Sequence, residues 1–220
     1  DKTGTITEGK PKLVANEILT KSLTEARVQR LAAVLAGQSD HPVSKAIAQG
    51  LPQGTGGVDG FTALPGRGVR ASVDGEALVL GNHRLIEELG LCGPEIEARL
   101  YFHESQGRSV TLLASDTQVL ALFAVADTIK DSSRDALEEL HALGVSSVML
   151  TGDNSATART IALQAGIDDA RGDLLPEDKL VAIEEMQKKY GFTAMTGDGI
   201  NDAPALARSD MGFAMGAAGT

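Results

Sequence analysis

The sequence has one cysteine, Cys92, and no tryptophan among its 220 residues. A single cysteine excludes an intramolecular disulfide framework and favours a reducing compartment. Aromatic residues make up only 3% of the chain, so a pocket that holds a nucleobase between aromatic rings is not expected. Apolar residues make up 42%, which is enough to form one large domain or two modest ones.

Long apolar runs and positive charge are also scarce. No apolar run approaches the roughly 20 residues of a membrane-spanning helix, and the longest, Val119–Ala126, has the length of a strand. The net charge of −10 argues against a nucleic-acid partner, because binding a phosphate backbone needs a basic face. An acidic chain can still bind a nucleotide when Mg²⁺ bridges the two.

The second half of the chain alternates between strand and helix patterns from about residue 126. Strands are predicted at 145–150, 192–196 and 211–214, and helices at 131–143, 154–166, 176–189 and from about 204. This alternation predicts an α/β fold with a doubly wound, Rossmann-like parallel sheet.

The stretch 17–125 has a different pattern. Two helices are followed by alternating strands, and Asp74-Gly75 between two of them is a strong hairpin signal. We therefore expect an inserted α+β domain at 17–125 with an antiparallel sheet, and a discontinuous α/β domain made of 1–16 and 126–220. An acid at a strand's carboxyl end needs an apolar strand before it, so Asp1 also predicts that the chain is cut from a longer one.

Four polar clusters follow predicted strands or open a predicted helix. They are the segment 1–7, the segment 151–153, Lys179 and the segment 196–202. Because the carboxyl ends of strands in an open parallel sheet lie along one edge, where such folds bind ligands, we expect these clusters to converge.

The residue types in these clusters suit phosphoryl transfer to a carboxylate. Asp1 would be the covalent nucleophile. Asp198, with Asp1 and the carbonyl of Thr3, would hold Mg²⁺, and Asp202 would lie just outside these ligands. Lys179 would attract the transferring oxygens by roughly 4 kcal/mol at about 4 Å, before any desolvation.

Thr151 and the amide of Gly152 would donate hydrogen bonds to the same oxygens. Taken singly, each cluster could instead be an ordinary turn or helix cap, since Asx residues and glycine favour both.

These motifs resemble those of the P-type ATPases, within the haloacid-dehalogenase-like superfamily, most specifically at 1–7 and 195–206. The resemblance implies that Mg·ATP phosphorylates Asp1, and that Thr3 replaces a second aspartate which related phosphatases use, so the acyl phosphate lasts longer. The catalytic residues that the resemblance implies are Asp1, Lys2, Thr3, Thr151, Gly152, Asp153, Lys179, Asn201 and Asp202. The magnesium ligands that it implies are Asp1, Thr3 and Asp198.

The insertion resembles the nucleotide domain of heavy-metal ATPases. The resemblance implies ATP contacts at His41, Pro42, Gly66, Gly68, Gly81 and Asn82. By default a histidine before Pro42 is a local cap. The family often has a glutamate where this chain has Ala36, with Gln38 or Asp40 as alternative acceptors for the adenine amino group, and this departure predicts weaker or differently oriented ATP binding. Asp127-Thr128 resembles the family's hinge pair.

The resemblance also implies partners. They are the transmembrane and actuator domains of a full-length pump, at the cytoplasmic face of a bacterial inner membrane, with the 220 residues themselves soluble and monomeric. The segments 174–179 and 216–220 look more like zinc, cadmium and cobalt exporters than copper exporters. A copper exporter is the alternative.

Two other functions compete with this interpretation. A soluble phosphatase of the same superfamily would be expected to have aspartate at Thr3. A metal-binding or sensor module is disfavoured by the single cysteine and the dispersed histidines. His83, His103 and His141 are therefore interpreted as ordinary surface or core residues, and Cys92 as an inert thiol.

Overall fold

The computed structural model describes residues 1–197 and 202–215. It separates into two compact units: residues 1–10 with 127–220 form the α/β unit, and residues 11–126 form the sheet unit. The expected first boundary at residue 16 falls inside β1 (Lys12–Ile18), which pairs with β6 (Val119–Ala126). The chain therefore joins the sheet unit directly after Lys10.

The sheet unit is built on one antiparallel sheet of six strands in the order β1-β6-β5-β4-β3-β2. Its other strands are β2 (Val58–Leu64), β3 (Gly68–Val73), β4 (Glu76–Gly81) and β5 (Ser109–Ala114). The hairpin predicted at Asp74-Gly75 joins β3 to β4. Asp74 and Gly75 have φ of 51° and 82°, the positive values that a tight hairpin turn requires.

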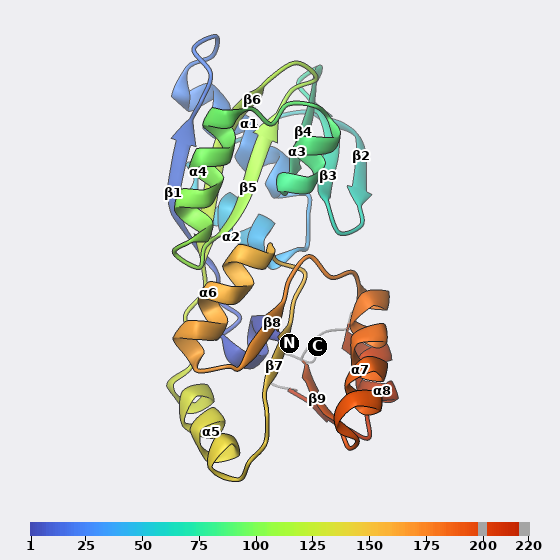
Figure 1. The fold of residues 1–220 in the computed structure, drawn as a ribbon. Coiled ribbons are helices and arrows are strands. Elements are labelled where there is room, and N and C mark those ends of the chain that lie inside the picture. The colour runs from blue at the N-terminus through green and yellow to red at the C-terminus, as the bar shows by residue number, and fades with distance from the viewer. Residues whose placement is uncertain (198–201, 216–220) are drawn as a thin grey trace. The chain divides into compact units, whose positions relative to one another are not determined.

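Helices cover both faces of this sheet (Figure 1). They are α1 (Glu25–Ala36) and α2 (Pro42–Gly50) on one face, and α3 (His83–Glu88) and α4 (Pro94–Glu104) on the other. In β6, Phe123 packs with α1 and α2, whereas Leu122 packs with α3 and α4. Alternate residues of a strand face opposite sides, so a strand buried on both faces needs the unbroken apolar run that β6 has.

The α/β unit contains two parallel strand pairs. They are β7 (Val148–Leu150) with β8 (Asp169–Arg171), and β9 (Ala194–Gly197) with β10 (Met211–Ala214). Its helices are α5 (Asp131–Ala142), α6 (Ser155–Ala165), α7 (Pro176–Tyr190) and α8 (Ala203–Arg208). Sequence patterns missed β8, because its Asp-Ala-Arg sequence has no apolar run.

Helices also flank the strands of the α/β unit on two sides. Met149 of β7 packs with α5 and α6, and the next residue, Leu150, packs with α7, α8 and β9. Helix α6 is capped by Asn154, whose side chain accepts a hydrogen bond from the Ala156 amide at 2.7 Å. The α/β architecture with an inserted antiparallel sheet is thus the one expected from the sequence.

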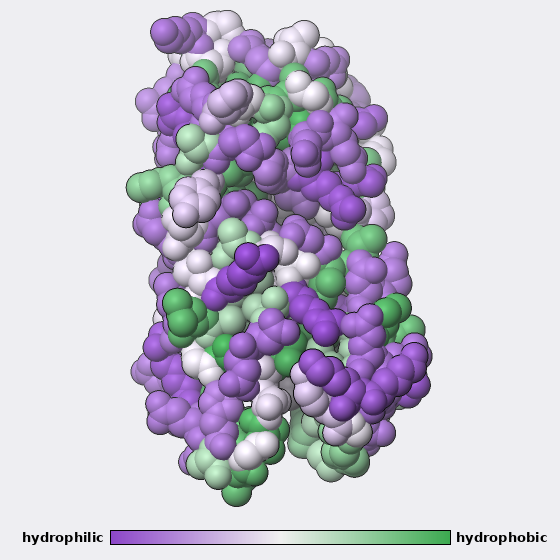
Figure 2. Space-filling model, viewed as in Figure 1, coloured by the Kyte–Doolittle hydropathy of each residue, from purple (hydrophilic) through white to green (hydrophobic). Residues whose placement is uncertain are grey.

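The visible surface is mostly hydrophilic, and its apolar side chains form small separate groups (Figure 2). Tyr101, Leu143 and Leu163 are among the more exposed large apolar residues. Across the ranges 1–197 and 202–215, no helix combines the length and apolarity that crossing a lipid bilayer requires.

Candidate active site

Lys179 is the centre of a buried charge cluster in the α/β unit. It lies in the first turn of α7, and its side chain is only 8% exposed. Its ammonium nitrogen Nζ is 2.7 Å from Asp1 Oδ1 and 2.7 Å from Asp202 Oδ1. Two carboxylates from opposite ends of the sequence, Asp1 and Asp202, therefore share one cation.

Strand β9 positions both carboxylates. The Asp1 nitrogen donates a hydrogen bond to the Thr196 carbonyl at 2.9 Å, which fixes the start of the chain beside the end of β9. Gly197 follows, and a Cβ there would lie 2.8 Å from Cβ of Asp202. Only glycine at 197 therefore leaves room for Asp202, which is 2% exposed.

A second buried ion pair lies at the end of β7. Lys2 Nζ is 2.5 Å from Asp153 Oδ2. The Thr151 hydroxyl donates to the same carboxylate at 2.9 Å and accepts from the Asp153 amide at 3.1 Å. Lys2 is 6% exposed and Thr151 is 3% exposed, so this group is held in one arrangement away from water.

The turn that contains Thr3 is irregular. Residues Lys2–Ile6 form a helical turn, η1, in which Thr3 is extended and Gly4 has a φ of 73°. Glycine adopts this left-handed conformation without the penalty that a Cβ brings. Lys130 Nζ donates to the Gly4 carbonyl at 2.6 Å, a support that no sequence motif indicated.

Asp127 fastens the end of this segment. Its carboxylate accepts hydrogen bonds from the Thr7 hydroxyl at 2.6 Å and from the amides of Gly9 and Lys10, both at 3.1 Å. Thr7 also forms a bridge with Ile129. Asp127 thus ties together the two stretches at which the chain leaves and re-enters the α/β unit.

The oxygen atoms gathered here suit a hard divalent cation. The Asp1 and Asp202 carboxylates lie on either side of Lys179, and Mg²⁺ prefers carboxylate and carbonyl oxygens with retained waters. Asp202 was expected to lie just outside the magnesium ligands. In the structure its carboxylate forms an ion pair with Lys179. Asp198 and Asn201, which the sequence analysis also placed in the site, lie outside the described residues.

In the sheet unit, the structure brings together Gly66, Gly68, Gly81 and Asn82. The Asn82 side chain donates to the Gly66 carbonyl at 2.9 Å and accepts from the Leu85 amide at 3.1 Å as the cap of α3. Gly68 and Gly81 pair across β3 and β4. We call these four residues the glycine–asparagine corner.

The two paired glycines are required by the closeness of the backbones. A Cβ on Gly68 would lie 2.3 Å from the Leu80 carbonyl oxygen, and one on Gly81 would lie 2.7 Å from the Arg67 carbonyl oxygen. Glycine at these two positions therefore lets β3 and β4 approach each other closely, which a side chain would prevent.

His41 and Pro42 lie at the start of α2. Pro42 is the first residue of the helix, and His41 caps it, with its Nδ1 accepting from the Val43 amide at 3.3 Å. The structure therefore confirms that His41 is a local helix cap, the default interpretation from the sequence. Ala36, at the position of the family's glutamate, is fully buried in α1, and the nearby Asp40 pairs with Lys45 at 3.0 Å.

Residues 1–210 match the family model of the haloacid dehalogenase-like hydrolases. The chain belongs to the haloacid dehalogenase-like hydrolase family. Within this family it resembles the heavy-metal P-type ATPases, which confirms the resemblance drawn from the motifs.

Two curated relatives are similar over nearly all of this haloacid dehalogenase-like chain. A probable cadmium-transporting ATPase of Alkalihalophilus pseudofirmus is 36% identical over 100% of the chain and 32% of its own length. A copper-transporting P-type ATPase of Rhizobium leguminosarum bv. viciae is 42% identical over 98% of the chain and 26% of its own length. The chain thus spans a third or less of either relative.

A solved structure supports the fold. The catalytic domain of the CPx-ATPase CopB-B, which changes conformation upon nucleotide binding, matches with a TM-score of 0.71 and 25% identity. The match covers 96% of this chain and 73% of that one. The α/β fold with its inserted sheet is therefore that of a P-type ATPase catalytic domain.

Proposed function

We propose that this chain is the ATP-using part of a heavy-metal efflux pump, in which Asp1 accepts the γ-phosphoryl group of Mg·ATP. The observation that carries the proposal is Lys179, whose ammonium lies 2.7 Å from both the Asp1 and the Asp202 carboxylates. A carboxylate nucleophile needs such a neighbouring cation to approach the negatively charged phosphoryl group.

The neighbouring residues supply positioning and electrostatics. Asp1 attacks the γ-phosphorus and ADP leaves, which forms an aspartyl phosphate. Lys179 orients the attacking carboxylate and balances charge on the phosphoryl oxygens, in a buried place where water does not screen it. Lys2 and Thr151, fixed through Asp153, hold the end of β7 beside the start of the chain.

Magnesium fits this donor set. The ligands would be the Asp1 carboxylate and the Thr3 carbonyl, together with Asp198, all of them hard oxygen donors. When bound, Mg²⁺ supplies positive charge to the phosphoryl oxygens.

The sheet unit is the proposed nucleotide-binding region. The glycine–asparagine corner joins β3, β4 and the start of α3, and His41 presents an exposed imidazole at the start of α2. Nucleotide contacts at His41, Pro42 and this corner follow the family resemblance. With Ala36 buried in α1, the adenine amino group lacks the glutamate acceptor that related domains offer, which should weaken ATP binding.

The transported ion is proposed to be a divalent transition metal of the zinc, cadmium or cobalt kind. The relatives comprise a probable cadmium-transporting and a copper-transporting ATPase, so copper is the alternative cargo. The remaining pump parts, a membrane domain and an actuator domain, would place this monomeric catalytic part at the cytoplasmic face of a bacterial inner membrane.

The test is phosphorylation by γ-labelled Mg·ATP in a chain extended to include the residues before Asp1. Asp1→Asn should abolish the acid-stable label while ATP binding, measured by calorimetry, persists. The matched control Asp116→Asn changes a carboxylate in a turn of the sheet unit and should leave the label intact. Label that persists in Asp1→Asn would exclude Asp1 as the acceptor.

The haloacid dehalogenase-like family also contains the competing function, a soluble phosphatase. Thr3 argues against it, since it offers no carboxylate to activate water. Rapid hydrolysis of a phosphomonoester such as p-nitrophenyl phosphate, if it is lost in Asp1→Asn, would favour the phosphatase function over the pump.

A further inference from the structure

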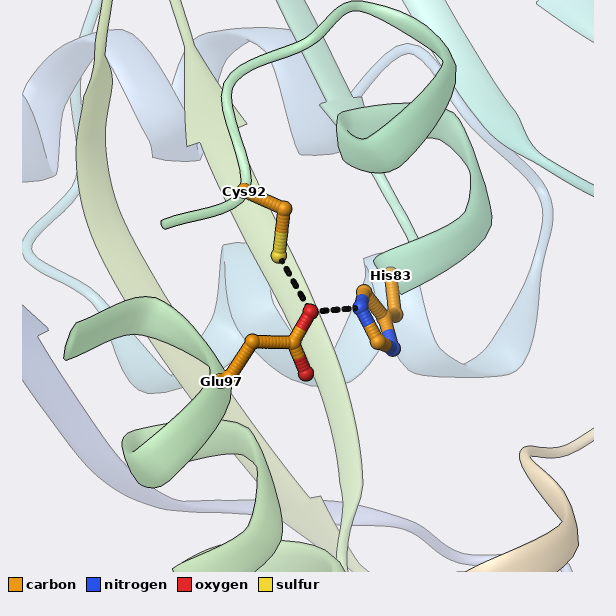
Figure 3. A group of neighbouring side chains, drawn as sticks. All are labelled: His83, Cys92 and Glu97. Carbon is orange, nitrogen blue, oxygen red and sulfur yellow. Dashed lines mark hydrogen bonds and ion pairs between the residues drawn. The ribbon is translucent and has the colours of Figure 1, made fainter. Parts of the chain in front are cut away.

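Three side chains with different donor atoms converge on one point in the sheet unit. His83 is the first residue of α3, Cys92 lies in the loop between α3 and α4, and Glu97 lies in the first turns of α4. Figure 3 shows the three side chains pointing toward one another from these separate elements. Glu97 Oε1 lies 2.9 Å from His83 Nε2 and 3.1 Å from Cys92 Sγ.

We propose that His83, Cys92 and Glu97 bind one divalent metal ion of the Zn²⁺ or Cd²⁺ type. Thiolate sulfur, imidazole nitrogen and carboxylate oxygen together form a donor set that such ions accept, with a water molecule in the fourth position. The thiolate selects against Mg²⁺, which prefers oxygen ligands. The site is therefore chemically distinct from the magnesium site proposed at Asp1.

The observed spacing is close to that of a tetrahedral site. All three donor atoms lie within 4.8 Å of one another. Zinc bonds of about 2.0–2.1 Å to nitrogen and oxygen and about 2.3 Å to sulfur require separations of about 3.3 Å for nitrogen to oxygen and about 3.6 Å for sulfur to oxygen. Each observed hydrogen bond therefore has to lengthen by only about half an ångström.

The surroundings permit this small expansion. The Glu97 side chain is 49% exposed and the His83 side chain is 25% exposed, so both can adjust without disturbing the core. Gly90 and Gly93 flank Cys92 in its loop, with open space around both. Cys92 also forms part of the wall of a surface pocket of about 420 Å³.

Metal binding at this site has to displace the proton of the Cys92 thiol. Burial, together with the hydrogen bond to Glu97 and the charges of Glu97, Glu87 and Glu104, raises the pKa of the Cys92 thiol to about 12. The thiol is therefore protonated at neutral pH and donates to Glu97. Metal binding forms the metal–sulfur bond and releases the thiol proton to water, while Glu97 exchanges its hydrogen bonds for the cation.

The consequence of binding is a link between α3 and α4. His83 directly follows Asn82, which caps α3 and holds the Gly66 carbonyl. A metal at His83 would fix the first turn of α3, the loop with Cys92 and the start of α4 to one another. This site does not depend on the proposed phosphoryl transfer, because it needs neither Asp1 nor a nucleotide.

The test is titration of the 220-residue chain with Cd²⁺ and Co²⁺, without nucleotide. Because Cys92 is the only cysteine, a thiolate-to-metal charge-transfer band can arise only at this site. We expect a band that saturates at one equivalent of Cd²⁺, release of one proton, and a higher midpoint temperature of unfolding with metal bound.

Variants distinguish a metal site made by all three side chains from binding of Cd²⁺ to the Cys92 thiol alone. Cys92→Ser should abolish the band, and His83→Ala and Glu97→Gln should each weaken Cd²⁺ binding at least tenfold. The control His141→Ala removes a histidine that pairs with Asp168 elsewhere and should bind Cd²⁺ as the unaltered chain does. A missing band, or one equally strong in His83→Ala and Glu97→Gln, would overturn the proposal.

Discussion

The two units position their candidate residues by different physical means. In the α/β unit, Lys2, Lys179 and Asp202 are charged and less than 8% exposed, and each forms an ion pair. In the sheet unit, His41 is exposed, and the glycine–asparagine corner is shaped by close backbones and a single asparagine. The candidate site of the α/β unit depends on buried charged side chains, whereas the glycine–asparagine corner of the sheet unit depends on glycines that have no side chain.

The two units should therefore respond differently to substitutions of these residues. Removing one partner of a buried ion pair leaves an uncompensated charge in a poorly solvated place. Adding a side chain at a crowded glycine instead forces two backbones apart. The exposed imidazole of His41 takes part in neither kind of contact, and in the described structure it caps α2 through the Val43 amide.

Lys179→Met should give the largest effect. It leaves the Asp1 and Asp202 carboxylates buried without their shared cation, so the free energy of unfolding should fall by about 3–5 kcal/mol. Urea unfolding of the α/β unit measures this loss. The control Lys188→Met, at an exposed position of α7, should stay within about 0.5 kcal/mol. Equal losses in the two variants would contradict the role of buried charge.

Gly68→Ala tests whether the stability of the sheet unit requires a residue without a side chain at position 68. The new Cβ would lie 2.3 Å from the Leu80 carbonyl oxygen, and Gly68 has a φ of 147°, so the free energy of unfolding should fall by about 3 kcal/mol. Gly75→Ala is the matched control, because Gly75 has a φ of 82° and open space around it. Strain alone should lower its stability by about 1 kcal/mol, and similar losses would show that crowding at Gly68 is unimportant.

His41→Asn should separate capping from ligand binding. Asparagine caps helices well, so α2 should keep its stability, while loss of the imidazole should weaken Mg·ATP binding about tenfold, or about 1.4 kcal/mol. Calorimetric titration measures the affinity, with His141→Asn as the control. Unchanged affinity would leave His41 as a cap only.

The smallest effect is expected in the acid stability of the sheet unit. Burial alone would raise the pKa of Glu17, but hydrogen bonds from His103 and Arg99 outweigh it, so the pKa lies below the usual 4.5. A carboxyl group with a lowered pKa stabilises the fold above its usual value, and this contribution is lost as the pH falls through the lowered pKa.

Glu17→Gln should therefore flatten the fall in stability of the sheet unit below about pH 4.5. Thermal unfolding at several pH values measures the slope. Exposed Glu138→Gln, on α5, should leave the slope unchanged. A slope that is identical in Glu17→Gln and the unaltered chain would contradict this role of Glu17.

Much of the fold followed from local patterns. The hairpin at Asp74-Gly75 and the apolar run of β6 could be predicted because each depends on neighbours in the sequence. The first domain boundary was misplaced, because nothing in residues 11–16 distinguishes a linker from an edge strand that pairs with β6. Strand β8 was missed because its polar sequence carries no strand pattern.

The candidate site was predictable in part. Asp1, Asp153 and Lys179 belong to motifs at strand ends or helix starts, and the structure pairs Asp1 with Lys179 and Asp153 with Lys2. Lys130 was missed, since its contact is with a backbone carbonyl and leaves no signature in the sequence. The shared hydrogen bonding of Asp1 and Asp202 to Lys179 was also not foreseen.

The sequence alone determined the family and the two kinds of architecture, because motifs and periodicity are properties of neighbouring residues. Only the tertiary structure decided which distant groups share a partner. His83, Cys92 and Glu97 looked unrelated along the chain, and they meet only because α3, its following loop and α4 pack on one face of the sheet. Contacts between separate elements depend on packing, which no local pattern encodes.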